Sequence, residues 1–357
     1  MKIIDNIYDQ PNRLQKILNT HATIANDLTE LVTKNQIKKV YLTGSGTSYH
    51  AATLIAMYFN KFTNLDAQAI IPGNFTNYLQ PSPYFKAQET LLIGISQSGT
   101  STSTLETIRK AKKLNFNTVA ISEETKSKIA QESDLVIYLN TGDEVIPVET
   151  RGYTSTIMLG LLLALHLGLA QKVITEENYK KFLTQTEQEL KKLPTTLSNT
   201  EEFYLQHKNE LVTMKKGAIA GYGYNYATAL EAYLKMYETF HAPLTVHEFG
   251  ELLHGYEMAF DSEQYIFLII ANGPEKELAN KYLDFLKQVT KHLFVITDQN
   301  LEFIPEAKVL KVPSLTYDEL SPFNLIIPFQ IIASRNCEAI GYDTAKYPLK
   351  IESFAHF

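Results

Sequence analysis

Residues 91–114, LLIGISQSGTSTSTLETIRKAKKL, contain the stretch that decides the fold. An apolar run stops at Ser96, eight of the nine residues from Ser96 to Thr104 are Ser, Thr or Gly, and a helical pattern follows at once. An apolar run that passes directly into a helical pattern predicts a buried strand followed by a helix. The hydroxyl-rich turn between them raises the question of what it binds.

The same alternation of apolar runs and helical patterns recurs along the chain. In the first half the other predicted strands are KKVYLTG (38–44), AQAIIPG (67–73), FNTVAIS (116–122) and DLVIYLN (134–140). A charged helical stretch, broken at Pro194, precedes a second series of such runs. Alternation of this kind predicts β-α units and largely parallel sheets, which define the α/β class.

We therefore predict two α/β domains joined by a connector. An N-terminal helix and the first domain cover residues 1–172, the helical connector covers 173–200, and the second domain with a C-terminal tail covers 201–357. The two domains look like a diverged repeat, because GSG at 44–46 and GYG at 221–223 each follow the first strand of a domain. The second copy has NGPEKE where the first has SQSGTS, so we expect only the first to bind an anion in that turn.

The totals exclude several classes of protein. The chain has 357 residues, a formal net charge of −6 and one cysteine, Cys337. A general nucleic-acid binder needs a basic face, and an anionic membrane surface is an equally poor partner for this charge. A single cysteine excludes an internal disulfide framework and fits a reducing compartment, so we expect a cytoplasmic protein. The longest apolar stretch, 157–170, is too short to span a bilayer and predicts a buried helix.

Two turns, 44–48 and 96–104, have the chemistry of an anion site. Small residues let the backbone approach a ligand, and the free N–H groups at a helix start favour an anion. Hydroxyls add further donors without bulk, so a phosphate monoester is the natural ligand. The alternative is that these residues only cap helices, and for GSG alone that would be the better interpretation. The turn at 96–104 holds more hydroxyls than one cap needs, and it lacks the Gly-Lys-Ser/Thr of a Walker loop.

A second group of chemically active residues lies on a predicted helix in the second domain. Glu231, Lys235 and Glu238 stand at offsets of four and three, so they share one face. From spacing alone a solvated row of salt bridges is the better interpretation. However, the surrounding helix is apolar and aromatic, which is typical of a helix that lines a cleft. HEFGELLHG (247–255) does not satisfy H-E-x-x-H, so we predict no metal site there.

GSGTSYHAA (44–52) and SQSGTSTSTLETIRKAK (96–112) resemble the two phosphosugar-binding turns of the sugar isomerase (SIS) family. The tandem arrangement resembles the isomerase half of glucosamine-6-phosphate synthase and the related fructosamine-6-phosphate deglycases. The resemblance implies two SIS domains, each a mostly parallel sheet flanked by helices in a flavodoxin-like, three-layer arrangement. The phosphate-binding residues that it implies are Ser48, Ser96, Gln97, Ser98 and Ser101. The further substrate-binding residues that it implies are Gly46, Thr47, Glu149 and Glu231.

The same resemblance implies catalytic roles. In the family a helix carries E-x-x-x-K-x-x-E, and a His-Gly follows sixteen residues after the last Glu, which matches Glu231, Lys235, Glu238 and His254. Carried over, Glu238 is the base that moves a proton between C1 and C2. His254 opens the sugar ring from a neighbouring subunit, so a homodimer or larger assembly is implied. The family's tail lysine aligns with Lys350, and no cofactor or metal is required.

Departures from the family pattern narrow the function. The family's Val-Ala-Ser-Thr-Lys reads PVETR at 147–151, so Glu149 replaces a serine that contacts sugar hydroxyls. A carboxylate there suits a substrate with an amine or a differently substituted sugar; the alternative is a surface glutamate paired with Arg151. The chain starts Met1-Lys2 without the family's glutaminase domain, so we expect no ammonia from glutamine and rank a fructosamine-6-phosphate deglycase first. The alternatives are an amino-sugar-phosphate isomerase or deaminase and a non-catalytic regulator that binds sugar phosphates. No DNA-binding segment is recognisable before Val40.

Overall fold

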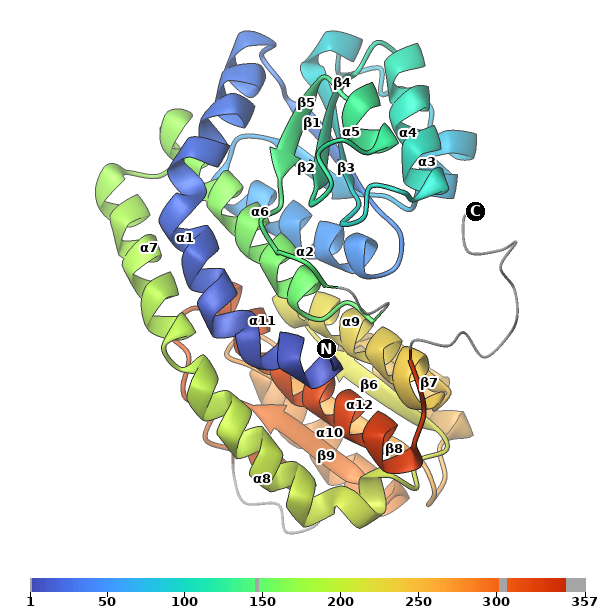
Figure 1. The fold of residues 1–357 in the computed structure, drawn as a ribbon. Helices are drawn as coiled ribbons and strands as arrows, with labels where there is room; N and C mark the ends of the chain where they lie inside the picture. The colour runs from blue at the N-terminus through green and yellow to red at the C-terminus, as the bar shows by residue number, and fades with distance from the viewer. Residues whose placement is uncertain (1, 145–147, 302–306, 345–357) are drawn as a thin grey trace. The chain divides into compact units, whose positions relative to one another are not determined.

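The computed structural model describes residues 2–144, 148–301 and 307–344, and the chain divides into two units (Figure 1). The first unit consists of Asn12–Val145 and Arg151–Glu187. The second unit consists of Met1–Pro11, Ile146–Thr150 and Gln188–Lys346. Each unit contains one sheet, and each is described by itself.

The first unit is built on a parallel sheet with the strand order β2-β1-β3-β4-β5. Its strands are β1 (Lys39–Thr43), β2 (Asp66–Ala69), β3 (Thr90–Ile95), β4 (Asn117–Ser122) and β5 (Leu135–Tyr138). Every residue of β1 and β3 is buried, which is expected for parallel strands whose two faces are both covered. In the register, Lys39 of β1 lies opposite Asp66 of β2 and Thr90 of β3.

Helices cover both faces of this sheet. The helices of the first unit are most of α1 (Ile3–Lys34), α2 (Thr47–Phe62), α3 (Pro72–Tyr78), α4 (Thr102–Lys113), α5 (Lys128–Glu132), α6 (Arg151–Ala170) and α7 (Glu176–Leu190). On one face, Phe75 of α3, Ile108 of α4 and Ile129 of α5 pack in one cluster with Leu92 of β3. Helices α2 and α6 pack on each other at the opposite face.

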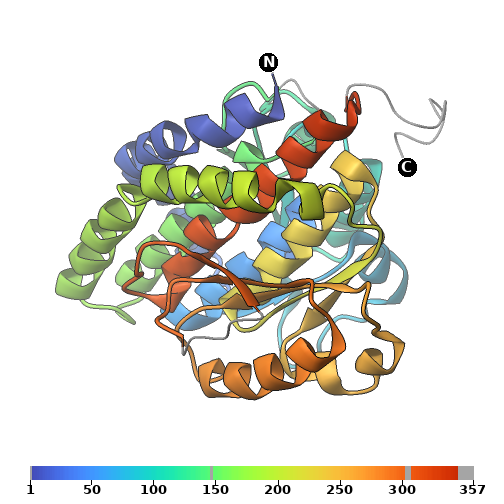
Figure 2. The same cartoon turned by 90° about the horizontal axis from the view of Figure 1, so that it is seen from below.

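The second unit repeats this architecture. Its strands are β6 (Gly217–Gly221), β7 (Leu244–Glu248), β8 (Tyr265–Ile270), β9 (Leu293–Thr297) and β10 (Ala307–Lys311). Its longer helices are α8 (Leu193–Leu211), α9 (Tyr224–Phe240), α10 (Lys276–Val289) and α12 (Ile327–Ile340), with the short α11 (Ser321–Leu325). Figure 2 shows α10, in orange, on one face of the sheet and α9 with α12 on the other.

The two sheets confirm the predicted α/β class and share one topology. The order β10-β9-β8-β6-β7, read from its other edge, matches β2-β1-β3-β4-β5 strand for strand. The glycines that precede α2 and α9 adopt the same unusual backbone conformation: φ and ψ are 54° and −126° at Gly46, and 53° and −130° at Gly223. A positive φ of this kind favours glycine, so both turns have a glycine in the same conformation before the helix.

Some local predictions differ from the structure. Strand β7 was missing from the sequence-based assignment, because the glycines at 250 and 255 made its neighbourhood read as loop. The predicted strand 67–73 ends at Ala69, since Pro72 starts α3 instead. Pro194 and Pro328 lie in the first turns of α8 and α12, where proline is tolerated, so each marks a helix start.

Helix α6 carries the longest apolar stretch of the sequence. Among the residues that the structure describes, it alone is long and apolar enough to cross a membrane by length and composition. However, 83% of its most apolar window is buried in the protein. A helix that is apolar all round and buried in this way is typical of a domain core.

Candidate functional site

The hydroxyl-rich turn lies between β3 and α4, at the carboxyl end of the first sheet. The neighbouring turn after β1 meets it there: the Ser45 hydroxyl lies 2.9 Å from that of Ser103 and 3.5 Å from that of Ser101. Within the turn, the Ser98 and Thr100 hydroxyls are 2.8 Å apart. These hydroxyls bond largely to one another. Each can rotate so that it donates its hydrogen bond to a bound anion in place of a neighbouring hydroxyl.

Backbone geometry keeps this turn tight. Gly99 has a φ of 65°, and a Cβ there would lie 2.1 Å from the Ser127 Oγ. The Ser101 side chain accepts a hydrogen bond from the Thr104 N–H at 3.4 Å, so this one serine caps α4 as the capping interpretation predicts. The remaining hydroxyls of the turn exceed what that cap requires.

The structure brings the predicted phosphate-binding residues into one region of the first unit. Ser96 and Thr47 are buried, Gln97, Ser101 and Ser48 are half-buried, and Ser98 and Gly46 are exposed. The Ser96 N–H donates to the Ile121 carbonyl at 3.0 Å, which continues the sheet ladder and fixes the start of the turn. The side chains then emerge where ligands usually bind in open α/β sheets.

The turn after β8, which corresponds to the hydroxyl-rich turn of the first unit, carries Glu275, and further acidic groups lie near it. Asp298 follows β9 and is buried, and Asp318 lies close enough to Asp298, Glu275 and Glu319 for their charges to act on it. Burial first, and then the charge of Glu319, raises the pKa of Asp318 to about 6. A phosphate dianion is repelled by such surroundings, which supports the expectation that only the first unit binds one.

Asp318→Asn is expected to stabilise the protein near neutral pH. The pKa of Asp318 is raised to about 6 in the folded state, so its protonated side chain favours folding. This contribution to the free energy of unfolding is fully present below the unfolded pKa of the group and is lost as the pH rises through 6. We expect a gain of about 1 kcal/mol near pH 7.5, discounted for partial exposure, that shrinks towards pH 4. Thermal unfolding at several pH values measures this; an equal gain at every pH would contradict the assignment.

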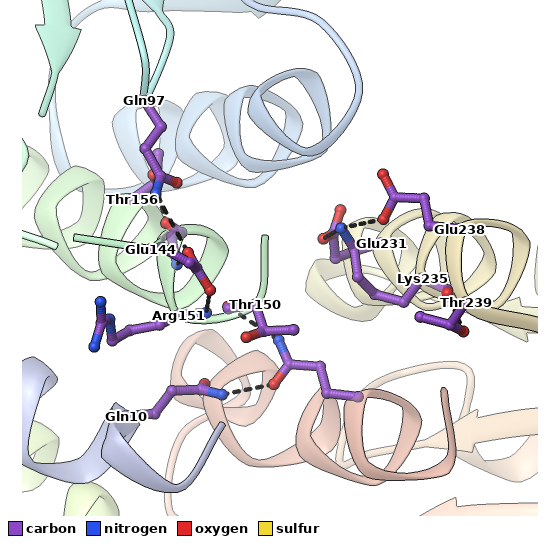
Figure 3. Close-up of polar contacts among 12 residues, drawn as sticks. Gln10, Gln97, Glu144, Thr150, Arg151, Thr156, Glu231, Lys235, Glu238 and Thr239 are labelled. Carbon is purple, nitrogen blue, oxygen red and sulfur yellow. Dashed lines mark hydrogen bonds and ion pairs between the residues drawn. The ribbon is translucent and has the colours of Figure 1, made fainter. Parts of the chain in front are cut away.

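The second candidate group lies on α9 in the second unit (Figure 3). The Lys235 Nζ lies 3.1 Å from Glu231 Oε1 and 2.7 Å from Glu238 Oε2. The side chains of Lys235 and Glu231 are 1% and 0% exposed, whereas that of Glu238 is 32% exposed. The row is therefore a buried ion pair beside one partly exposed glutamate, and the solvated salt-bridge row that spacing alone favoured is excluded.

Three carboxylates act on the charge of Lys235. Burial by itself lowers the pKa of Lys235, but Glu231, Glu238 and Glu149 together outweigh it and raise that pKa above its ordinary value. The lysine therefore stays cationic, with three carboxylates acting on one cation. Glu149 belongs to the same unit, and its neighbour Thr150 is held by a 3.1 Å hydrogen bond from the Gln330 amide to the Thr150 carbonyl.

Among the residues that the structure describes, no hydrogen bond or ion pair joins His254 to these groups. His254 is exposed after the 3₁₀ helix Gly250–Leu253, and its backbone N–H donates to the Glu251 carbonyl at 3.1 Å. Lys350 lies outside the described residues. A cavity of about 520 Å³ beside β7 includes the neighbouring Gly255 in its wall but none of the predicted site residues.

The structure offers no metal centre in the part of the chain that it describes. There, no three His, Cys, Asp or Glu side chains come close enough to hold an ion. His247, from the stretch that invited a metal interpretation, bonds instead through Nε2 to the Thr245 hydroxyl at 2.8 Å. Its ring also lies 4.3 Å from that of Tyr256, centroid to centroid.

Comparison with known proteins now decides the family. The family model of the SIS domain matches residues 35–166 and 210–328, which cover the β-α units of both sheets. The chain belongs to the SIS domain family. This confirms the resemblance that the two turns carried, and it makes the protein a tandem of two SIS domains.

The relatives of this SIS protein are longer than it is. It is 27% identical over 361 residues to a glutamine–fructose-6-phosphate aminotransferase [isomerizing] of Caldanaerobacter subterraneus, covering 96% of this chain and 57% of that protein. A human aminotransferase of the same name, number 2, is 27% identical over 315 residues, covering 86% and 44%. The chain thus spans about half the length of the curated relatives that it matches.

Solved structures share the tandem SIS fold. A candidate phosphosugar isomerase from Clostridium difficile has a TM-score of 0.89 at 26% identity, covering 98% of this chain and 96% of that one. The C-terminal domain of a glucosamine-fructose-6-phosphate aminotransferase from Francisella tularensis has a TM-score of 0.87 at 21% identity, covering 96% and 97%. A glucosamine-6-phosphate deaminase from Thermotoga maritima has a TM-score of 0.72 at 21% identity, covering 98% of both chains.

Sequence reasoning missed one residue of the first SIS domain. Glu144 accepts a hydrogen bond from the Gln97 side-chain amide at 3.3 Å, although the two residues are 47 positions apart. The available signal was a carboxylate shortly before the start of α6, where acidic groups are favoured by the helix dipole. A carboxylate at this position predicts helix capping, but it does not predict the contact between Glu144 and Gln97 of the turn after β3.

Proposed function

We propose that the protein cleaves a fructosamine 6-phosphate into a hexose 6-phosphate and a free amine. Membership of the SIS family supports chemistry on a sugar phosphate, and several relatives are of the phosphosugar-isomerase type. The observation that carries the finer proposal is that a third carboxylate, Glu149, acts on Lys235 beside the two glutamates of α9. A substrate with a cationic amine fits that charge, whereas a simple hexose phosphate gains nothing from it.

The proposed reaction is a proton transfer followed by hydrolysis. The hydroxyls and backbone N–H groups of the turn after β3 bind the phosphate, and Glu238 acts as the base. Glu238 takes a proton from C1, which is acidified by the C2 carbonyl, and the electron pair forms an enaminol. Return of a proton to C2 gives an imine at C1. Water adds to that imine, the C–N bond breaks, and the amine leaves with the aldehyde restored at C1.

Lys235 supports this role of Glu238 electrostatically. Its ammonium lies 2.7 Å from the Glu238 carboxylate, so it favours the ionised form of the base. Its second partner, Glu231, is fully buried and keeps the lysine in place. The exposed third of the Glu238 side chain leaves the carboxylate open to a substrate.

The test is to incubate the protein separately with fructoselysine 6-phosphate and glucosamine 6-phosphate. We expect glucose 6-phosphate and lysine in equal amounts from the first, measured by a coupled dehydrogenase assay and amine analysis. Absence of both products, with the folded protein verified, overturns the deglycase proposal.

A second candidate is an amino-sugar-phosphate deaminase or isomerase. The same carboxylates suit the 2-amino group of glucosamine 6-phosphate, and the shared fold with the Thermotoga maritima deaminase is in keeping with it. Release of ammonia and fructose 6-phosphate from glucosamine 6-phosphate, without cleavage of the fructosamine, would select this function.

We further propose that a second copy of the chain supplies His254, and mixing two inactive variants tests this. If Glu238 and His254 of one site come from different subunits, mixed dimers of Glu238→Gln and His254→Ala regain one intact site of two. Random exchange should then restore about a quarter of the wild-type activity. The activity is measured after dissociation and reassociation, with exchange verified by differently tagged subunits. Exchanged but inactive dimers would contradict a shared site.

A further inference from the structure

We infer that Glu144 and Gly152 are positioning residues that orient the Gln97 amide for phosphate binding. The inference rests on the proposed function, because Gln97 belongs to the turn to which we assign the phosphate. All three residues lie in the first unit.

Glu144 is itself held rigidly. Its carboxylate accepts the backbone N–H of Arg151 at 3.1 Å and that of Gly152 at 2.9 Å, in the first turn of α6 (Figure 3). The partial positive charge of a helix N-terminus further favours a carboxylate at this place. The oxygen that meets Gly152, Oε2, also accepts the Gln97 Nε2–H bond at 3.3 Å. A fixed acceptor thus reaches from α6 to the turn after β3.

This contact sets which end of the Gln97 amide is presented. A carboxylate only accepts hydrogen bonds, so it selects the NH₂ group and repels the amide oxygen. The Gln97 Oε1 is buried and has no hydrogen-bond partner among the residues that the structure describes, so no donor there competes with this choice. One hydrogen of the NH₂ group is used by Glu144, and the other stays available for an anionic oxygen.

Gly152 provides the space that this orientation needs. A Cβ at position 152 would lie 1.8 Å from Gln97 Oε1 and 3.0 Å from Glu144 Oε2. The first distance is too short for a real contact and the second is tight, so a side chain here must displace the Gln97 amide and crowd the Glu144 carboxylate. The missing side chain of Gly152 and the fixed carboxylate of Glu144 therefore both control the orientation of the Gln97 amide.

The consequence is a turn that is oriented before its ligand arrives. Preorganised donors cost less on binding than donors that must first be ordered. Loss of the orientation removes one charge-assisted hydrogen bond, and we expect about a 10-fold to 100-fold loss of affinity for a phosphate-bearing ligand.

The test is a double-mutant cycle of Gly152→Ala and Gln97→Ala on the full-length protein. The affinity for glucose 6-phosphate and for inorganic phosphate is measured by calorimetry, and KM and kcat with the substrate that the function assay identifies. We expect Gly152→Ala to weaken binding about tenfold and raise KM more than it lowers kcat. In the Gln97→Ala background, Gly152→Ala should lower the affinity less than about twofold, because the Gln97 Oε1 atom with which the new Cβ collides is absent.

Two further variants complete the design. Gly73→Ala is the matched control, since a Cβ there meets nothing within 4 Å, and it should bind as the wild type does. Glu144→Asp keeps the charge but withdraws the carboxylate, so it should weaken binding like Gly152→Ala and gives an independent reading if that variant folds poorly. Thermal unfolding verifies that each variant is folded.

The outcomes separate this inference from the function on which it rests. If the wild type binds phosphate and both Gly152→Ala and Glu144→Asp bind it equally well, the positioning role is overturned. It is also overturned if Gly152→Ala lowers the affinity by the same factor in the wild-type and the Gln97→Ala backgrounds. A wild type that binds neither glucose 6-phosphate nor inorganic phosphate overturns the proposed function, and the positioning role with it.

Discussion

Glu238→Gln is expected to reduce turnover by about 10²-fold to 10⁴-fold, which is the range for loss of a positioned general base. The amide cannot accept the C1 proton, but it keeps the shape of the side chain and can still contact Lys235. Phosphate binding is assigned to the first unit, so the affinity for glucose 6-phosphate should stay within about twofold of the wild type. Steady-state kinetics and calorimetry on the same preparations measure the two quantities.

The control for this variant is Glu202→Gln, the same chemical change at an exposed position of α8. It should leave turnover, affinity and thermal stability unchanged. Retention of full activity by Glu238→Gln would remove this residue from the mechanism. A wild type that binds the sugar phosphate but turns over neither test substrate would favour the regulator alternative.

Lys235→Met is expected to destabilise the protein by about 3–5 kcal/mol, the typical cost of breaking a buried ion pair from one side. Methionine is similar in length but carries no charge, so the fully buried Glu231 loses the cation that lies 3.1 Å from its carboxylate. Denaturant unfolding, followed by a probe in the second unit, measures the loss. The melting temperature should fall by several degrees for a protein of this size.

The double variant Glu231→Gln/Lys235→Met separates the charge effect from packing. It removes both buried charges, so it should regain much of the stability that the single variant loses. A single variant as stable as the wild type would show that the pair is not buried as described. Equal destabilisation in the single and double variants would assign the effect to packing alone.

Much of the fold was predictable because both sheets are parallel and buried. The central strands β3 and β8 are fully buried, largely apolar runs, so their ends could be read directly from the sequence. Strand β7 was not predictable in this way, since it lies at a sheet edge and its sequence, LTVHE, is not a continuous apolar run. The predicted domain limits at residues 172 and 200 stay predictions.

The candidate site was predictable in its residue types but not in its environment. Spacing placed Glu231, Lys235 and Glu238 on one face, yet it cannot distinguish a solvated face from a buried one, and α9 turned out to be buried there. Within the second unit, Gln330 donates a hydrogen bond to the carbonyl of Thr150, 180 positions away in the sequence. No local pattern encodes such a contact.

The central claim is that the turn after β3 binds the phosphate of a sugar phosphate. A crystal structure of the Glu238→Gln variant with fructoselysine 6-phosphate tests it most directly, because the variant should bind the substrate without consuming it. We predict the phosphate group within hydrogen-bond distance of Ser96, Gln97, Ser98 and Ser101. A phosphate bound elsewhere, with this turn unoccupied at saturating ligand, would contradict the account.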